Sequence, residues 1–150
     1  ESPVVSQNFL FVKEEVIKPS QSLLTEKKVL LVEDNKINQM ITQKMLEKRG
    51  ISCNIIDNGE DAIEDTKINN YDLILMDVHL PGINGTEATS EIRKFNSQIP
   101  IVALTAISLN ENREMLLSYG MNEVITKPFE PEHFYTVVTS YLTNNVQSNS

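Results

Sequence analysis

The chain lacks tryptophan, contains one cysteine and has only 6% aromatic residues among its 150 residues. A single cysteine excludes an internal disulfide framework. We interpret Cys53, which lies in the apolar run ISCNII, as a small buried thiol rather than a reactive one. We therefore expect a fold without covalent cross-links.

Positive charge is also scarce, since 13 lysines and arginines face 21 aspartates and glutamates, which gives a net charge of -8. This balance disfavours nonspecific nucleic-acid binding, because no basic stripe offsets phosphate repulsion. No apolar stretch approaches the roughly 20 residues of a membrane span, and no signal peptide opens the chain. We expect a cytoplasmic protein with no nucleic-acid partner and no direct membrane contact. The composition is compatible with a protein partner and with a dimer.

The chain is long enough for one ordinary domain with an appendage, and 40% hydrophobic and 23% charged residues are typical of a globular core. It begins with Glu1 rather than Met, so we expect a piece of a longer protein, which could carry a membrane anchor elsewhere. We interpret residues 1–27 as a linker or the tail of a preceding domain, with one candidate strand at residues 9–12. The folded domain is expected over residues 28–143, followed by a polar tail over residues 144–150.

From Lys28 onwards, apolar strand patterns alternate with helix patterns five times. The expected strands cover residues 29–32, 51–56, 73–76, 101–104 and 124–126. This alternation predicts an α/β fold with a doubly wound, five-stranded parallel sheet and five flanking helices. The flavodoxin-like strand order 2-1-3-4-5 places its crevice between strands one and three.

Capping residues and apolar spacing mark the helices between these strands. Asn35, Asn58 and Ser108 are the expected N-caps. The first and third helices carry apolar residues three or four positions apart, and the last carries an apolar stripe at i, i+3, i+4 and i+7. These residues are Ile37, Ile41 and Met45 in the first helix, Ala88, Ile92 and Phe95 in the third, and Phe134, Val137, Val138 and Tyr141 in the last.

Polar side chains stand where four of the expected strands end. Glu33 and Asp34 follow the first strand, Asp77 the third, Thr105 the fourth and Lys127 the fifth. Because parallel strands end together at one edge of a sheet, we expect these groups to share one pocket. Three carboxylates, one ammonium and one hydroxyl suit a divalent cation and a phosphoryl group.

Taken together, these residues resemble the receiver domain of response regulators. The resemblance covers about residues 28–142, and the segment MDVHLPGING is similar to the phosphorylation loop of the family. The segment EDNKINQ is most similar to receivers that are fused to hybrid sensor histidine kinases. The family implies the flavodoxin-like fold, a cis peptide bond between Lys127 and Pro128, and a role in two-component or phosphorelay signalling.

The resemblance also implies a nucleophile and a metal site. Asp77 would accept a phosphoryl group from a phosphohistidine of a histidine kinase or a histidine phosphotransfer domain. Glu33, Asp34, Asp77 and the backbone carbonyl of His79 would hold Mg²⁺. Without a cation, three nearby carboxylates repel one another, so at least one of their pKa values should rise.

Further residues are expected to bind the phosphoryl group and to carry a switch. Lys127, the Thr105 hydroxyl and the backbone amide of Ala106 would bind the phosphoryl oxygens. Thr105 would then move with its loop and repack the face formed by the fourth helix, the fifth strand and the fifth helix. The family often has Tyr or Phe three residues before the lysine. This chain has Val124 there, so we expect signalling through loop and helix shifts.

The sequence leaves other functions open. A Mg²⁺-dependent phosphatase of the aspartyl-phosphate type shares the Asp nucleophile but typically has a second acid two residues later, where this chain has His79. A scaffolding receiver without chemistry should have lost a key residue, and all are present. A flavin carrier is disfavoured because the acidic loop EDNK stands where a phosphate-cradling loop is needed. A receiver is not a conventional enzyme, although it assists its own phosphorylation and dephosphorylation.

Overall fold

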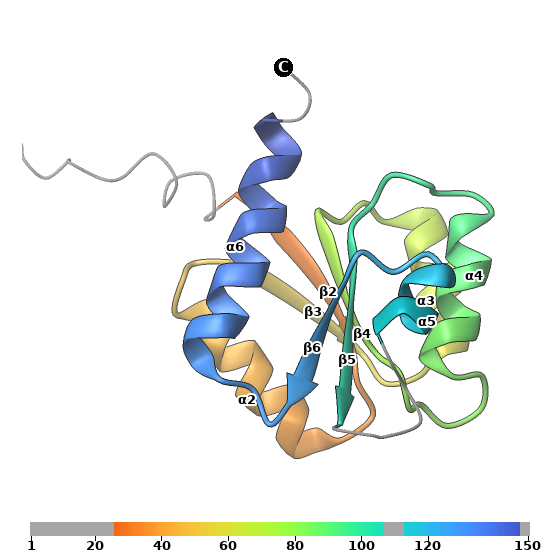
Figure 1. Ribbon diagram of the computed structural model, residues 1–150, viewed down its shortest axis with the longest axis horizontal. Coiled ribbons are helices and arrows are strands. Elements are labelled where there is room, and N and C mark those ends of the chain that lie inside the picture. Colours follow the sequence, from red (N-terminus) through yellow and green to blue (C-terminus); the bar gives the residue numbers. More distant parts are fainter. Residues whose placement is uncertain (1–25, 107–112, 148–150) are drawn as a thin grey trace, which may run out of the picture.

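The computed structural model describes residues 26–106 and 113–147, with side chains described as far as Thr143. Strands and helices alternate throughout this part (Figure 1), and each of the five predicted strands is confirmed. The elements are β2 (Lys28–Val32), α2 (Lys36–Glu47), β3 (Ser52–Ile56), α3 (Gly59–Ile68), β4 (Leu73–Asp77), α4 (Gly85–Arg93), β5 (Ile101–Ala106), α5 (Arg113–Ser118), β6 (Glu123–Lys127) and α6 (Pro131–Gln147).

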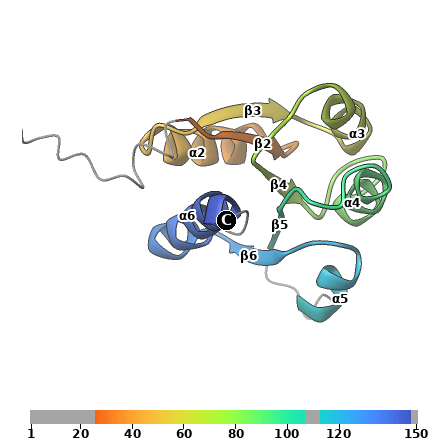
Figure 2. The ribbon, with the colours of Figure 1, turned by 90° about the horizontal axis from the view of Figure 1, so that it is seen from above.

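The five strands form one parallel sheet in the order β3-β2-β4-β5-β6. Numbered along the chain as strands one to five, this order is 2-1-3-4-5, which confirms the predicted topology. Figure 2 shows α2 and α6 covering one face of the sheet and α3, α4 and α5 covering the other. A parallel sheet is buried on both faces by its crossover helices, which explains why its strands are apolar runs rather than alternating patterns.

Two hydrophobic clusters, one on each face of the sheet, hold these layers together. The central strand β4 is buried at all five of its positions. Leu73 and Leu75 belong to the cluster on the α2–α6 face, whereas Ile74 and Met76 belong to the cluster on the α3–α5 face. Full burial of one such side chain contributes about 1.5–3 kcal/mol to folding, so a strand of this kind anchors both layers.

Asparagine side chains begin three of the helices. Asn35 and Asn58 each accept a hydrogen bond from the backbone N–H three residues later, at 2.9 and 2.7 Å, so both predicted N-caps are confirmed. Asn84 forms a capping box at the start of α4. The predicted cap at Ser108 and the candidate strand at residues 9–12 lie outside the described residues.

The apolar spacing in α2 does not mark its buried face. Ile37 is 66% exposed and Ile41 is 48% exposed, whereas the buried residues are Gln39, Thr42 and Leu46. The helix is therefore turned so that two polar side chains lie inward, Ile37 and Ile41 lie outward, and Met45 alone of the predicted stripe packs against the core. The hydrogen bond of Gln39 to the backbone after β2, described below, is one physical reason for this orientation.

The third and last predicted helices differ in how well their apolar residues are buried. α4 ends at Arg93, so Phe95 lies beyond it and is 42% exposed. In α6, Phe134, Val137 and Val138 are buried, which confirms the inward face of the predicted stripe. α6 continues to Gln147, into the segment expected to be a polar tail. Within residues 26–106 and 113–147, none of the helices combines the length and hydropathy needed to span a bilayer.

Candidate functional site

The predicted acidic residues meet at the carboxyl-terminal edge of the sheet. Glu33 and Asp34 directly follow β2, and Asp77 is the last residue of the adjacent strand β4. One carboxylate oxygen from each of these three residues lies within 4.8 Å of the others. The crevice thus forms where the strand order reverses, between β2 and β4, as the topology predicts.

Lys127, the last residue of β6, reaches the same crevice from the far side of β5. Its Nζ lies 3.2 Å from Glu33 Oε1 and 3.4 Å from Asp77 Oδ2. Glu33 is 1% exposed and Asp77 is 3% exposed, while Asp34 is open to solvent. One ammonium therefore offsets only part of the charge of three carboxylates, two of which are buried. Buried charge that is not fully paired is costly, and the site accordingly favours a further cation.

The pKa of Asp77 reflects both its burial and the charges around it. The pKa of Asp77 is raised from 3.8 to about 7, mainly because burial removes the carboxylate from water. A hydrogen bond and the negative charge of Glu33 raise the pKa further, whereas Lys127 and the backbone N–H of His79 act in the opposite direction. The prediction that one carboxylate of the trio has a raised pKa is confirmed for Asp77.

The donor set fits a hard divalent cation. The three candidate ligand atoms of Glu33, Asp34 and Asp77 are all carboxylate oxygens, and oxygen ligands are those that Mg²⁺ prefers. His79 lies two residues beyond Asp77 and donates its backbone N–H to Asp77 Oδ1 at 3.0 Å. This bond holds the loop after β4 against the carboxylate and places the His79 backbone beside the cluster.

Thr105 and Ala106 end β5, between the acidic strand β4 and the strand that carries Lys127. Ala106 pairs with Lys127 in the sheet, and the Thr105 hydroxyl donates to the Ala106 carbonyl at 3.1 Å. Thr105 is buried, whereas Ala106 is exposed. The structure thus brings both residues to the correct edge of the sheet, with the hydroxyl bonded within its own strand end. Val124 is partly buried and packs against the cluster on the α3–α5 face.

The sequence assigned no role to Gln39, whose side chain bonds the backbone of the acidic loop after β2. Its Nε2 donates to the backbone carbonyl of Glu33 at 2.6 Å, and the side chain is buried. The bond fixes the backbone of the residue that also pairs with Lys127. A signal was present in the sequence, because Gln39, Thr42 and Leu46 lie at i, i+3 and i+7 and share one helix face.

Gly85 is a second residue whose role the sequence reasoning missed. A Cβ at this position would lie 2.1 Å from the backbone carbonyl oxygen of Asp77, a distance that no side chain can occupy. Its N–H donates to the Val78 carbonyl at 2.8 Å, so the start of α4 lies directly against the end of β4. The sequence signal is the glycine that follows Asn84, the cap of α4.

Glu60 provides a further contact between α3 and the loop after Asp77. Its Oε2 accepts from the Ile83 backbone N–H at 3.3 Å. Gly82, which precedes Ile83, has φ of 71° and would place a Cβ 2.8 Å from the same carboxylate. The loop therefore needs glycine both for its left-handed backbone and for the approach of α3.

The peptide bond between Lys127 and Pro128 is cis, which confirms the expectation for this position. Beside it, a groove of about 460 Å³ lies between α2 and the start of α6. Ile41, Met45, Pro128, Phe129 and Tyr135 give the groove its apolar lining, and Lys127 borders it. A hydrophobic recess therefore adjoins the polar crevice.

Comparison with known proteins identifies the class to which this fold and site belong. Residues 29–139 match the response regulator receiver domain family, so the chain belongs to this family and is a receiver domain of two-component signalling. Among solved structures, the receiver domain of sensor histidine kinase PA1611 from Pseudomonas aeruginosa is 36% identical, with a TM-score of 0.73, and covers 78% of this chain and 98% of its own. That receiver has a magnesium ion coordinated in its active-site cleft.

Curated relatives include proteins of several kinds that share this domain. The transcription factor SKN7 of Saccharomyces cerevisiae is 34% identical over 118 residues, which cover 79% of this chain and 19% of the relative. The hybrid signal transduction histidine kinase I of Dictyostelium discoideum is 34% identical over 142 residues, which cover 89% of this chain and 8% of the relative. The chain therefore spans a fifth or less of these relatives.

Proposed function

We propose that this receiver accepts a phosphoryl group on Asp77 from a phosphohistidine, and that phosphorylation switches the domain. The observation that carries this proposal is the position of Asp77, which is buried within 4.8 Å of two further carboxylate ligands and 3.4 Å from an ammonium group. A buried, partly neutralised carboxylate at an open strand end is a suitable nucleophile for in-line phosphoryl transfer.

In this reaction an Asp77 carboxylate oxygen attacks the phosphorus atom, and an O–P bond forms as the N–P bond of the phosphohistidine breaks. The bonding electron pair leaves with the imidazole nitrogen. Lys127 offers its ammonium to a phosphoryl oxygen, and Thr105 and the Ala106 amide offer hydrogen bonds to others. Because phosphoryl transfer needs positioning and charge stabilisation more than covalent help, these contacts account for most of the expected assistance.

Glu33, Asp34, Asp77 and the backbone carbonyl of His79 are the proposed ligands of Mg²⁺. When bound, Mg²⁺ neutralises charge on the carboxylates and on the phosphoryl oxygens. Gln39 positions the Glu33 backbone, and the His79 N–H orients the Asp77 carboxylate. In the proposed switch, Thr105 moves toward the phosphoryl group and shifts the α5–β6–α6 face, without an aromatic partner because Val124 stands there.

The proposal is tested with acetyl phosphate and Mg²⁺ as a small phosphodonor system. Intact-mass measurement should detect one phosphoryl group, labile to hydroxylamine, and Asp77→Asn should abolish it. Asp57→Asn is a matched control, because Asp57 is an exposed aspartate just beyond the end of β3, which β2 separates from the strand of Asp77. An adduct that persists in Asp77→Asn contradicts the assignment. Steady hydrolysis of unrelated phosphomonoesters would instead identify a phosphatase.

We further propose that the phosphodonor is a histidine kinase or a histidine phosphotransfer domain that docks on α2 and the apolar groove beside Pro128. Ile37, Met40 and Ile41 are exposed on α2, 66%, 54% and 48% respectively. Such a cluster of exposed apolar side chains is typical of a protein interface. The groove leads directly to Lys127, so a helix lying in it would present a histidine near Asp77.

The docking site is tested by comparing two phosphodonors. Met40→Glu should lower the rate of phosphotransfer from a purified phosphorylated histidine phosphotransfer protein by about tenfold or more, as expected for a central interface residue. The rate with acetyl phosphate should stay unchanged, since the small donor needs no docking surface. Phe95→Glu, at another exposed apolar residue away from α2, is the control. Equal losses with both donors would contradict a docking role for Met40.

The relatives in hybrid histidine kinases lead us to propose the same setting for this chain, with residues 28–143 as the receiver and residues 1–27 as its link to a preceding segment. The proposed setting is cytoplasmic, where the phosphodonors of such relays act. Sequencing of the full gene tests this directly. A kinase region encoded upstream supports the proposal, and a complete reading frame without one contradicts it.

A further inference from the structure

β3 forms one edge of the sheet, and no other strand within residues 26–106 and 113–147 pairs with its outer side. Hydrogen bonds at its two ends show which backbone groups face β2: the Ser52 N–H and the Ile56 carbonyl bond to the β2 side at 3.1 and 3.0 Å. Since backbone groups alternate in direction along a strand, those of Cys53 and Ile55 point to the open edge. This edge is therefore a ready template for a further strand.

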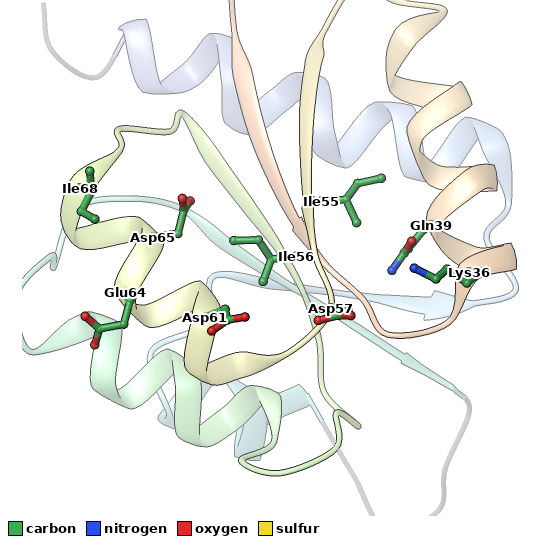
Figure 3. A pocket seen from close by; sticks show the side chains of 9 residues that line it. All are labelled: Lys36, Gln39, Ile55, Ile56, Asp57, Asp61, Glu64, Asp65 and Ile68. Carbon is green, nitrogen blue, oxygen red and sulfur yellow. The ribbon is translucent and has the colours of Figure 1, made fainter.

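A groove of about 660 Å³ lies at the carboxyl-terminal end of this edge, where Ile55, Ile56 and Asp57 line it. Figure 3 shows that α2 borders it on one side and α3 on the other. Ile55 points to the α2 side, where Lys36 and Gln39 lie, and Ile56 points to the α3 side. A strand added to β3 would extend the sheet between the two helices and would send alternate side chains to each side.

The chemistry of the groove selects the charge of its occupant. The α3 side carries Asp61, Glu64 and Asp65, and Asp57 lies at the end of β3. Against these four carboxylates, Lys36 is the one cation among the residues that line the groove. Ile68, also on the α3 side, is 80% exposed. Lysine or arginine side chains could cover this isoleucine with their aliphatic stems while their charges reach the carboxylates.

We propose that the β3 edge binds an extended, cationic segment of a partner protein as a sixth strand. The bound segment alternates lysine or arginine residues, which face α3, with small apolar residues, which face Ile55. Main-chain hydrogen bonds to Cys53 and Ile55 provide the docking, and the carboxylates provide the specificity. A second copy of this chain is a poor occupant, because it would bring two acidic edges together. The proposal does not depend on phosphorylation of Asp77.

Amide hydrogen exchange of the full 150-residue chain tests this proposal with two synthetic heptapeptides. One is an acetylated and amidated alternation of four lysines with three valines, and the other carries glutamate in place of lysine. The lysine peptide, at about ten times its Kd, should slow exchange of the Cys53 and Ile55 amides by about tenfold. The glutamate peptide should not slow it. The effect should weaken as salt is raised, because three of the four groove carboxylates, those of Asp57, Asp61 and Glu64, are exposed.

Two matched variants locate the effect on α3. Glu64 and Glu91 are both exposed and both pair with a lysine three residues later, at 3.2 and 2.9 Å, but only Glu64 lines the groove. Glu64→Lys should weaken binding of the lysine peptide about fivefold at low salt, whereas Glu91→Lys should change it less than about twofold. Glu64→Lys should also be phosphorylated by acetyl phosphate at the normal rate, which verifies the fold and separates this test from that of the proposed function.

Three results would overturn the proposal. The first is equal binding of the two peptides, or equal weakening by Glu64→Lys and Glu91→Lys. The second is protection of the Cys53 and Ile55 amides from exchange in the absence of peptide, if this protection increases with protein concentration. Such a result would identify a second copy of the chain as the occupant. The third is slow exchange without peptide that does not depend on concentration, which would identify a segment of the chain itself.

Discussion

Replacing the proposed nucleophile should stabilise the protein when no divalent cation is present. In the folded state the pKa of Asp77 is about 7, raised from 3.8 chiefly by burial. At a pH between these two pKa values, Asp77 is protonated in the folded chain and ionised in the unfolded chain. The free energy of unfolding therefore falls as the pH rises from about 4 through 7. Asp77→Asn removes this titration together with the repulsion from Glu33.

The difference between a pKa of 3.8 and one of about 7 sets the ceiling of the effect. At about 1.4 kcal/mol for each pKa unit, this ceiling is about 4 kcal/mol. Asparagine keeps the shape but loses the contact with Lys127, so we expect about 1–3 kcal/mol of stabilisation at pH 8. For a domain of this size, such a gain raises Tm by about 4–12 °C.

Thermal unfolding in EDTA, recorded at pH 4 and pH 8, measures this effect. The Tm of Asp77→Asn should exceed that of the parent chain at pH 8, and the difference should be much smaller at pH 4, because this pH is close to the unfolded pKa of 3.8 and little of the linked free energy has developed there. Asp57→Asn removes an exposed carboxylate outside the crevice and should change Tm little. At 10 mM Mg²⁺ the parent chain should gain stability that the variant lacks, about 1.4 kcal/mol for a Kd near 1 mM. A Tm difference that is absent or negative at pH 8 would refute the reasoning.

Three further variants probe the same crevice. Lys127→Met should raise the pKa of Asp77 above about 7, because it removes a charge that lowers it, and carboxyl NMR titration would detect the change; an unchanged or lower pKa would contradict the pairing. Gly85→Ala should cost about 3 kcal/mol of unfolding free energy, because its Cβ would lie 2.1 Å from the Asp77 carbonyl oxygen, and urea denaturation measures this cost; a loss below about 1 kcal/mol would speak against so close a contact. Gln39→Met should cost about 1–2 kcal/mol by leaving the Glu33 carbonyl without its 2.6 Å bond and should weaken Mg²⁺ binding in calorimetry, whereas unchanged affinity would deny it a positioning role.

The sequence predicts the fold well because the parallel sheet imposes its own pattern. β4 reads LILMD and is buried on both faces, so its apolar run and its terminal aspartate are visible without coordinates. The same rule brings Asp77 and Lys127 to one edge of the sheet, although they lie 50 residues apart in the chain. Strand ends are thus predictable because topology, and not side-chain detail, determines where they lie.

The parts of the site that escaped prediction depend on close approaches between backbones. Nothing in the composition of the loop after β4 specifies that Gly85 lies against the Asp77 carbonyl, or that Glu60 of α3 bonds the Ile83 amide. Such contacts arise when helices settle on the sheet, and a pattern of apolar and polar residues along one element does not encode them. The direction of the Thr105 hydroxyl, toward the Ala106 carbonyl, is likewise a property of the assembled strand end.

In α2, burial of apolar side chains competes with burial of Gln39, which bonds the backbone of Glu33. Packing alone would favour burial of Ile37 and Ile41, since each buried side chain of this kind contributes about 1.5–3 kcal/mol. Instead Gln39 and Thr42 face inward, and the Thr42 hydroxyl has no hydrogen-bond partner among the described residues. Burial of the Gln39 side chain allows its hydrogen bond to the Glu33 carbonyl and leaves Ile37 and Ile41 exposed. The hydrophobic pattern of α2 thus departs from its burial where Gln39 bonds the acidic loop, and we expect this departure to mark the docking surface proposed for the phosphodonor.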